Sequence, residues 1–280
     1  MERSPGLDLE QNREASRSVR HPNHPDDVTE RTPPEVVQDR SRSLRSSEIR
    51  AMSDIGKFRI VDVDDLGRFA YRGNGAEMTQ DIQSLRSKGL IEERTFYRAH
   101  RQLRRVVTLT ENGHRTLRNS GQVPHGQQLH YGFVKTRDID HDADLYKVYQ
   151  KEADDIQRQG GKVTKIRLDC ELNSTMARER FAARKRPKAQ KQAWLQASAE
   201  QHGLSIKSGT VSLPDIQIEY ETVEGTIAHE NLELVSEHYG RDAICSKAEA
   251  GFKVYVRSGD SNRVRRALND SGSIDRILSI

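Results

Sequence analysis

The most constraining feature of the sequence is a helical segment that ends at a glycine and is followed directly by β-prone residues. The helical pattern of residues 77–88 ends at Gly89, and the apolar pair Leu90–Ile91 comes next. A second β-prone run, residues 105–109, returns after a basic loop. Thr110 then precedes an acidic residue and is placed to cap a last helix, because a hydroxyl accepts hydrogen bonds from a first turn. This order of elements is typical of one small class of α+β domain.

Two further helices are predicted before this segment, with Ser47 and Asp64 as their N-caps. The third helix is expected to start near Glu77 and to bury apolar residues spaced four and three apart: Met78, Ile82 and Leu85. Its opposite face is polar, and the candidate DNA-contacting residues there are Gln80, Gln83, Arg86 and Lys88. Glutamine and arginine can hydrogen-bond base edges, and lysine can bind a phosphate.

The loop between the two β-prone runs is basic, and residues 98–105 contain four arginines and no acidic residue. These candidate phosphate ligands are Arg98, Arg101, Arg104 and Arg105. The polar helix face and the basic loop together predict double-stranded DNA as a partner.

Two short runs carry a family resemblance. Leu-Arg-Ser-Lys-Gly-Leu-Ile followed by Leu-Thr-Glu-Asn-Gly-His resembles bacterial winged-helix regulators of the multiple-antibiotic-resistance type. The same runs are similar to the N-terminal half of the replication-relaxation proteins of plasmids and conjugative elements. The resemblance implies that residues 44–119 form a winged-helix DNA-binding domain. A winged helix used for protein contacts is the alternative reading.

Composition limits the remaining possibilities. The chain has 280 residues, of which 34% are hydrophobic and 31% charged, and its formal net charge is only +4. Any nucleic-acid surface must therefore be local. The two cysteines suit a reducing, cytoplasmic setting, and no apolar run approaches the length of a membrane span. No glycine-rich Walker loop indicates the use of ATP.

The N-terminal residues differ from the rest of the chain. Five of the eight prolines fall within the first 34 residues, and the apolar residues there are isolated. Such a segment cannot bury enough area to offset its chain entropy, so residues 1–43 are expected to be a disordered tail. A linker is expected at residues 120–129, where glycine and proline recur.

Residues 130–280 alternate between helical and strand patterns. The predicted strands are 131–134, 162–172, 206–213, 216–221, 227–235 and 252–256, and the predicted helices are 142–159, 241–250 and 263–268. A long helical insertion, residues 174–200, is interrupted by Pro187. Without this insertion the order from residue 142 to residue 256 is one helix, a series of strands, one helix and one strand.

That order resembles the core of the restriction-endonuclease-like PD-(D/E)xK fold. Pro214–Asp215 begins one strand and Glu233 lies on the next, as the two carboxylates of that motif would. The resemblance implies that these carboxylates are catalytic and bind Mg²⁺ as metal ligands. The lysine expected two positions after Glu233 is replaced by Val235, so the motif is incomplete. Lys247 could supply the missing charge, and Glu171 could add a further carboxylate.

The helical insertion is strongly basic. Seven cationic residues lie within fourteen positions, against a single acid, Glu179: Arg178, Arg180, Arg184, Lys185, Arg186, Lys188 and Lys191. A solvated helix face explains many such runs. This density also suits phosphate neutralisation, so Arg184, Lys185, Arg186 and Lys188 are candidate DNA-binding residues.

The sequence thus predicts an α+β protein with a disordered tail, a winged helix and an endonuclease-like α/β domain. Its expected function is DNA binding in the maintenance or regulation of a mobile element, without catalysis. The alternatives are a metal-dependent DNA endonuclease or nickase, and an adaptor that recruits a relaxase or another partner protein. No cofactor is expected unless the nuclease alternative holds, which would require Mg²⁺. A homodimer stays open, and no membrane association is expected.

Overall fold

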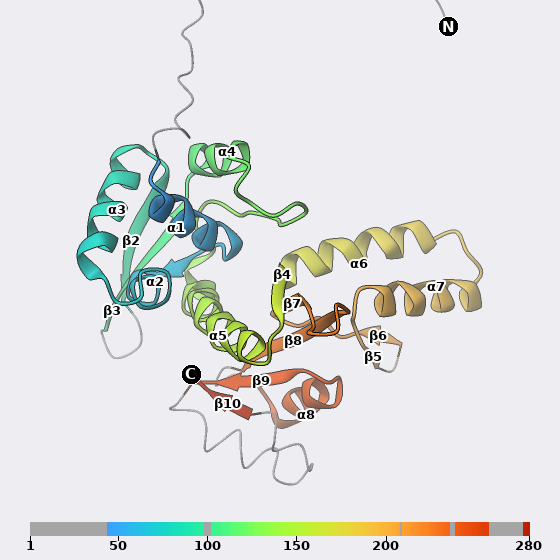
Figure 1. The fold of residues 1–280 in the computed structure, drawn as a ribbon. Helices are drawn as coiled ribbons and strands as arrows, with labels where there is room; N and C mark the ends of the chain where they lie inside the picture. Colours follow the sequence, from blue (N-terminus) through green and yellow to red (C-terminus); the bar gives the residue numbers. More distant parts are fainter. Residues whose placement is uncertain (1–43, 98–101, 208, 236–238, 258–276) are drawn as a thin grey trace, which may run out of the picture. The chain divides into compact units, whose positions relative to one another are not determined.

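The computed structural model describes residues 44–97, 102–207, 209–235, 239–257 and 277–280, which belong to one compact unit (Figure 1). Helices and strands are mixed along the chain, so the predicted α+β class is confirmed. The predicted tail, residues 1–43, and the predicted helix at 263–268 lie outside the described residues. Within the described ranges, no helix combines the length and the apolar character needed to cross a bilayer.

The first part of the fold has the predicted winged-helix order. Its elements are α1 (Ser46–Lys57), β1 (Val61–Asp62), α2 (Val63–Phe69), α3 (Gly75–Ser87), β2 (Ile91–Tyr97), β3 (Leu103–Leu109) and α4 (Glu111–Asn119). The three strands form an antiparallel sheet in the order β1-β3-β2. The predicted stripe of α3 faces the core, with Ile82 and Leu85 buried and Met78 partly buried.

Side-chain caps set the starts of α2, α3 and α4, whereas the prediction of Ser47 as the cap of α1 was wrong: α1 begins at Ser46, after Arg45. Thr110 accepts a hydrogen bond from the backbone of Gly113 at 3.0 Å, as predicted. Asp64 is not a cap, because Asp62 lies one position before α2 in extended backbone and accepts from the first-turn N–H groups instead. Asn74 caps α3, which therefore begins two residues earlier than predicted. A cap requires non-helical backbone, and helical periodicity alone does not locate it.

The second part contains a five-stranded sheet and the helices around it. Its elements are a 3-10 turn (Thr136–Asp138), α5 (Ile139–Arg158), β4 (Lys162–Leu168), α6 (Asp169–Ala183), α7 (Lys188–Gln201), β5 (Ile206–Lys207), β6 (Thr210–Val211), β7 (Ile216–Glu221), β8 (Ile227–Val235), α8 (Arg241–Glu249), β9 (Lys253–Val256) and β10 (Ile277–Ser279). The sheet order is β10-β9-β8-β7-β4. Strands β4, β7 and β8 are antiparallel neighbours, whereas β9 is parallel to β8.

Helices α5 and α8 cover opposite faces of this sheet. Successive strand residues point to opposite sides, so one strand can serve two cores. Tyr255 and Leu234 pack in the cluster that includes α5, whereas their neighbours Val254 and Val235 pack against α8. This two-sided packing explains why three successive residues of β9, Val254, Tyr255 and Val256, are all buried.

Three strand predictions were wrong. Residues 131–134 form no strand and lie in an irregular segment before α5. Strand β4 ends at Leu168, four residues early, because the chain turns there into α6. The predicted strand 206–213 consists of two short strands, β5 and β6, which pair with each other in a separate two-stranded sheet.

The core is continuous across the predicted linker. One hydrophobic cluster contains residues of α1, α3, α5 and the five-stranded sheet. Phe58 and Tyr146 meet edge to face at 5.4 Å, and the Tyr146 hydroxyl donates to Asp54 at 3.0 Å. From the loop before α5, the Gln127 amide group donates to the Ile166 carbonyl at 3.0 Å and accepts from the Ile166 N–H at 2.9 Å. The loop is therefore fastened to β4.

Candidate functional site

The polar face of α3 is the first candidate site, and it begins with two glutamines. Gln80 and Gln83 are exposed, on the face opposite the buried Ile82 and Leu85. The buried residues fix the helix against the winged-helix core, so the amides project into solvent from a rigid support. Amides in this position can donate and accept hydrogen bonds at the edges of bases.

Glu93 on β2 joins the helix to the strand hairpin. Its two carboxylate oxygens contact Arg86 on α3 at 3.0 Å and Arg105 on β3 at 2.7 Å. Both arginine side chains remain about half exposed, at 55% and 52%. A shared carboxylate restricts two guanidinium groups and leaves further N–H donors of each available. Lys88 is more enclosed, because it pairs with the buried Glu48 at 3.0 Å.

Arg104 does not belong to this surface, and its prediction as a DNA ligand is corrected. The residue is only 3% exposed. Its guanidinium contacts Asp62 and Asp144 at 2.7 Å and Asp140 at 3.1 Å. Burial disfavours the charged form of Arg104, but the nearby carboxylates outweigh this effect and raise the pKa of its guanidinium above the usual value. The side chain has no face left for a phosphate. Arg98 and Arg101 lie outside the described residues.

The second candidate site lies where β7 and β8 meet α8. Asp215 precedes β7, and its Oδ2 accepts a hydrogen bond from the Leu234 N–H at 2.8 Å. Glu233 on β8 is fully buried at 0% exposure. Lys247 reaches back from α8 to place its Nζ 2.8 Å from Glu233 Oε1. The structure therefore brings together three of the four residues predicted to converge.

Glu171, the fourth, lies elsewhere. Because β4 ends at Leu168, Glu171 belongs to the first turn of α6 and does not end a strand. Its Oε1 contacts His130 Nε2 at 2.9 Å and the Leu168 N–H at 3.4 Å. Its predicted part in the carboxylate cluster is corrected. Asp169 comes closer to Asp215, whose carbonyl accepts from the Asp169 N–H at 3.1 Å.

Three residues that sequence reasoning did not assign extend the cluster. His141 on α5 places Nε2 3.3 Å from Asp215 Oδ2 and Nδ1 3.2 Å from Asp142 Oδ1. Arg59, from the segment after α1, contacts Asp142 at 3.0 Å and Asp169 at 3.3 Å. The adjacent pair His141–Asp142 reads as a helix start in the sequence, and only the fold reveals that it meets Asp215.

The electrostatics of this cluster are those of buried, paired charges. Burial and the nearby Asp215 raise the pKa of Glu233 to about 7, although Lys247 and the Tyr239 hydroxyl oppose the shift. Burial disfavours the charge on His141, but hydrogen bonds to Asp142 and Asp215 outweigh it and raise its pKa to about 10. At neutral pH the imidazole is therefore cationic, and Glu233 lies near its titration midpoint.

These residues do not make a complete magnesium site as they stand. Mg²⁺ prefers several oxygen ligands in octahedral geometry. Within the described ranges, no group of three or more histidine, cysteine or acidic side chains is arranged to hold a metal ion. Lys247 and His141 contact oxygens of the two carboxylates that would serve as ligands. Glu233 Oε2 is buried and has no hydrogen-bond partner among the described residues.

The basic insertion forms a helical hairpin. Helix α7 starts directly after Pro187, and α6 and α7 lie side by side (Figure 1). The four predicted DNA-binding residues are all exposed around its turn: Arg184, Lys185, Arg186 and Lys188. Their exposure leaves them able to contact phosphates, in contrast to Arg104.

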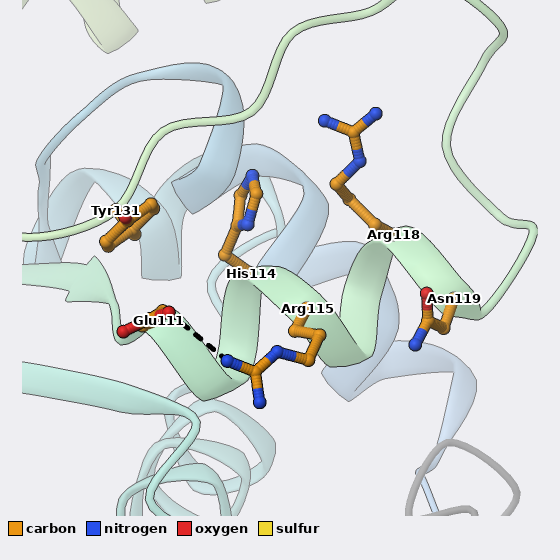
Figure 2. A pocket seen from close by; sticks show the side chains of 6 residues that line it. All are labelled: Glu111, His114, Arg115, Arg118, Asn119 and Tyr131. Atoms are coloured by element: carbon orange, nitrogen blue, oxygen red, sulfur yellow. Dashed lines mark hydrogen bonds and ion pairs between the residues drawn. The ribbon is translucent and has the colours of Figure 1, made fainter.

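A shallow pocket of about 300 Å³ lies along α4, and Figure 2 shows its lining. His114 and Tyr131 stand 5.1 Å apart between ring centres, and Glu111 pairs with Arg115 at 3.2 Å. Burial and the nearby Arg118 lower the pKa of His114. The lowered pKa favours the neutral imidazole, and the six residues that line the pocket include no serine or cysteine.

Comparisons with known proteins leave the family open. No protein-family model matches the sequence, and no curated protein matches it. Among solved structures, the chain is similar to Bacillus subtilis PadR in complex with operator DNA, with 14% sequence identity and a TM-score of 0.25. The similarity covers 57% of this chain and 78% of that chain. A likeness this weak carries no argument about function.

Proposed function

We propose that the protein binds duplex DNA through α3 and the β2–β3 hairpin. The observation that carries the proposal is the pair of guanidinium groups held by Glu93, beside the exposed Gln80 and Gln83. Two glutamines and two fixed arginines provide base-edge donors and acceptors together with phosphate contacts. In this arrangement α3 enters the major groove and the hairpin contacts the backbone.

Binding to a pool of duplex sequences tests the role of α3. Gln83→Ala is expected to change the preference at one base pair by about 1–3 kcal/mol, while affinity for non-specific DNA stays the same. Gln128→Ala is the matched control, because that glutamine is exposed in the loop after α4. An unchanged sequence preference in the Gln83 variant would contradict base readout by α3.

The salt dependence of binding tests the role of the β2–β3 hairpin. Arg105→Ala should weaken binding to every duplex and reduce the slope of log affinity against log salt by about 0.9 for one lost phosphate contact. Arg158→Ala, a change at an exposed arginine of α5, serves as the control. Equal slopes in both variants would remove β3 from the interface.

The finer role that we propose is maintenance or regulation of a mobile element in the cytoplasm. The resemblance to replication-relaxation proteins supports this role. It also suggests a relaxase as a protein partner, and a homodimer would present two α3 helices to a palindromic site. Pull-down with a relaxase and sedimentation with operator-length DNA test these two points separately.

A metal-dependent endonuclease is the second candidate. The observation that favours it is the contact between Lys247 and Glu233, which supplies a cation where the sequence motif lacks one. The element order around the sheet suits a restriction-endonuclease-like domain as well. Lys247 and His141 already contact the carboxylates of Glu233 and Asp215 that a metal ion would need, which argues for DNA binding without cleavage. We therefore expect purified protein with Mg²⁺ or Mn²⁺ to leave supercoiled plasmid intact.

The Asp215→Asn, Glu233→Gln double variant decides between the two candidates. These changes remove both negative charges and keep the side-chain shapes. Duplex binding in EDTA should be the same in the variant and the parent. Metal-dependent nicking by the parent that disappears in the variant would establish the nuclease instead.

A further inference from the structure

The α6–α7 hairpin exposes two aromatic rings that its own core does not need. Phe181 is 65% exposed and Trp194 is 38% exposed. The base of the hairpin has a separate apolar cluster, formed by Leu172, Met176, Ala199, Leu204 and Val211. Since this cluster packs the hairpin against the adjoining chain, the two rings are available at its outer part.

A guanidinium group covers each ring. Arg184 lies over Phe181 with 3.4 Å between Cζ and the ring centre, and Arg186 lies over Trp194 at 4.2 Å. The Trp194 indole N–H also donates to Glu179 at 3.0 Å. This hydrogen bond fixes the indole plane and occupies the acidic residue of the segment. Flat cationic and aromatic groups in contact make a surface on which another planar group can stack.

The cations of the hairpin greatly outnumber its acidic residues. All seven lysines and arginines between residues 178 and 191 are exposed, against one acid in the same span. Among the residues that the structure describes, no ion pair joins any of the seven to a carboxylate. Dense, unpaired positive charge releases counterions when it meets phosphates, so the surface suits a nucleic-acid backbone.

We propose that the α6–α7 hairpin binds single-stranded nucleic acid, with bases stacked on Phe181 and Trp194 and phosphates held by the surrounding cations. Paired bases in a duplex have no free face for an exposed ring, whereas unpaired bases do. Membrane lipid would require a wider apolar face, and the charged residues interrupt it here. The inference goes beyond duplex binding by α3 and does not depend on it.

The only tryptophan of the chain provides the measurement. Titrating the full-length protein with an oligothymidylate is expected to quench Trp194 fluorescence to saturation, because a stacked base contacts the indole directly. Oligouridylate in a parallel titration distinguishes DNA from RNA as the source of the strand. Absence of quenching and of binding by either oligonucleotide would overturn the proposal.

Two substitutions separate stacking from charge. Phe181→Leu keeps an exposed apolar side chain but removes the aromatic face, and it should weaken oligothymidylate binding by about 5- to 150-fold. Trp194→Phe keeps a ring and should bind almost like the parent. An unchanged affinity for Phe181→Leu would reduce the hairpin to a charged surface and overturn the stacking. Since Phe181 is exposed, its loss should leave the fold intact.

Variants of α3 keep the two proposals apart. Gln83→Ala should leave oligothymidylate binding unchanged, and Phe181→Leu should leave duplex binding unchanged. If duplex binding fails in the parent while the oligonucleotide still quenches Trp194, only the proposed function is lost. If the parent binds duplex DNA but the oligonucleotide neither binds nor quenches Trp194, only the proposal for the α6–α7 hairpin is lost.

Discussion

Arg104 and the arginines of the α6–α7 hairpin look alike in the sequence and differ completely in the structure. Both belong to basic runs with few acids close by. Arg104 is buried against Asp62, Asp140 and Asp144, whereas Arg184 and Arg186 are exposed and lie over aromatic rings. A local count of charges therefore does not distinguish a buried structural ion pair from an exposed basic surface.

The distinguishing information comes from distant residues. The three aspartates that contact Arg104 lie 36 to 42 positions away in the sequence. Asp144 in turn contacts Arg257 at 2.7 Å, from the chain after β9. The buried network thus ties β3 to α5 and to the C-terminal sheet. Among the described residues no such network involves the cations of the α6–α7 hairpin, and their exposed charge is open to a partner.

The largest expected effect belongs to Arg104→Ala. Removing the cation leaves buried carboxylates without compensation, which costs about 3–5 kcal/mol of the free energy of unfolding. Arg186→Ala, an exposed change of the same kind, should cost less than about 0.5 kcal/mol. Urea unfolding of both variants measures the difference, and equal stabilities would erase the distinction between the two regions.

Lys247→Met extends the comparison between buried and exposed charges to the buried carboxylate of Glu233, which Lys247 contacts. A raised carboxyl pKa means that the stability contribution is fully present below the unfolded value near 4.5 and is lost as pH rises through about 7. Without Lys247 the ionised Glu233 has lost its cation, so the variant should be destabilised more at pH 8 than at pH 5. Thermal unfolding at both values tests this, with Lys188→Met as the exposed control. A deficit independent of pH would show that Lys247 contributes by packing alone.

A smaller, pH-dependent effect is expected from His141→Gln. The raised pKa of His141 stabilises the fold fully below the unfolded value near 6.5, and this contribution disappears as pH rises through about 10. The parent should therefore lose stability between these values, and the variant should lose less over the same interval. Parallel curves for parent and variant would place the imidazole outside the ion pair with Asp215.

The smallest effect on stability is expected in the α6–α7 hairpin, where we expect a large effect on oligonucleotide binding. The Arg184→Gln, Arg186→Gln double variant should unfold like the parent, because both side chains are exposed. Its log–log salt dependence for oligothymidylate should fall by about 0.7 per lost phosphate contact. A marked loss of stability would mean that the hairpin, like Arg104, uses its charge structurally.

Local patterns predicted much of the fold. The Thr110 cap, the stripe of α3 and the order of elements from α5 to β9 follow from signals within a few residues. The ends of strands were less predictable. The alternating apolar pattern that predicts a strand continues past Leu168, but β4 ends at that residue and α6 begins directly after it. That early end turns Glu171 toward His130 and brings Asp169 toward Asp215.

The candidate site was predictable only in part. Asp215, Glu233 and Lys247 were found because a known motif order places two of them on adjacent strands. His141 and Arg59 come from other elements, and only the tertiary fold brings them to the cluster. The acidic partners of Arg104 were hidden for the same reason. In each of these cases the contacting residues lie far apart in the sequence, so no local sequence pattern shows that they meet.

The bidentate contact of Gln127 with Ile166 has a consequence for association between molecules. Strand β4 is the last strand of its sheet, so its outer backbone groups are open to pairing with another chain. The amide of Gln127 imitates a peptide group and occupies both outward groups of Ile166. Lys162 and Lys165 on the same strand add like charges that repel a second copy. One side chain from a loop thus covers part of the open edge of the sheet and reduces the number of backbone groups that a second chain could pair with.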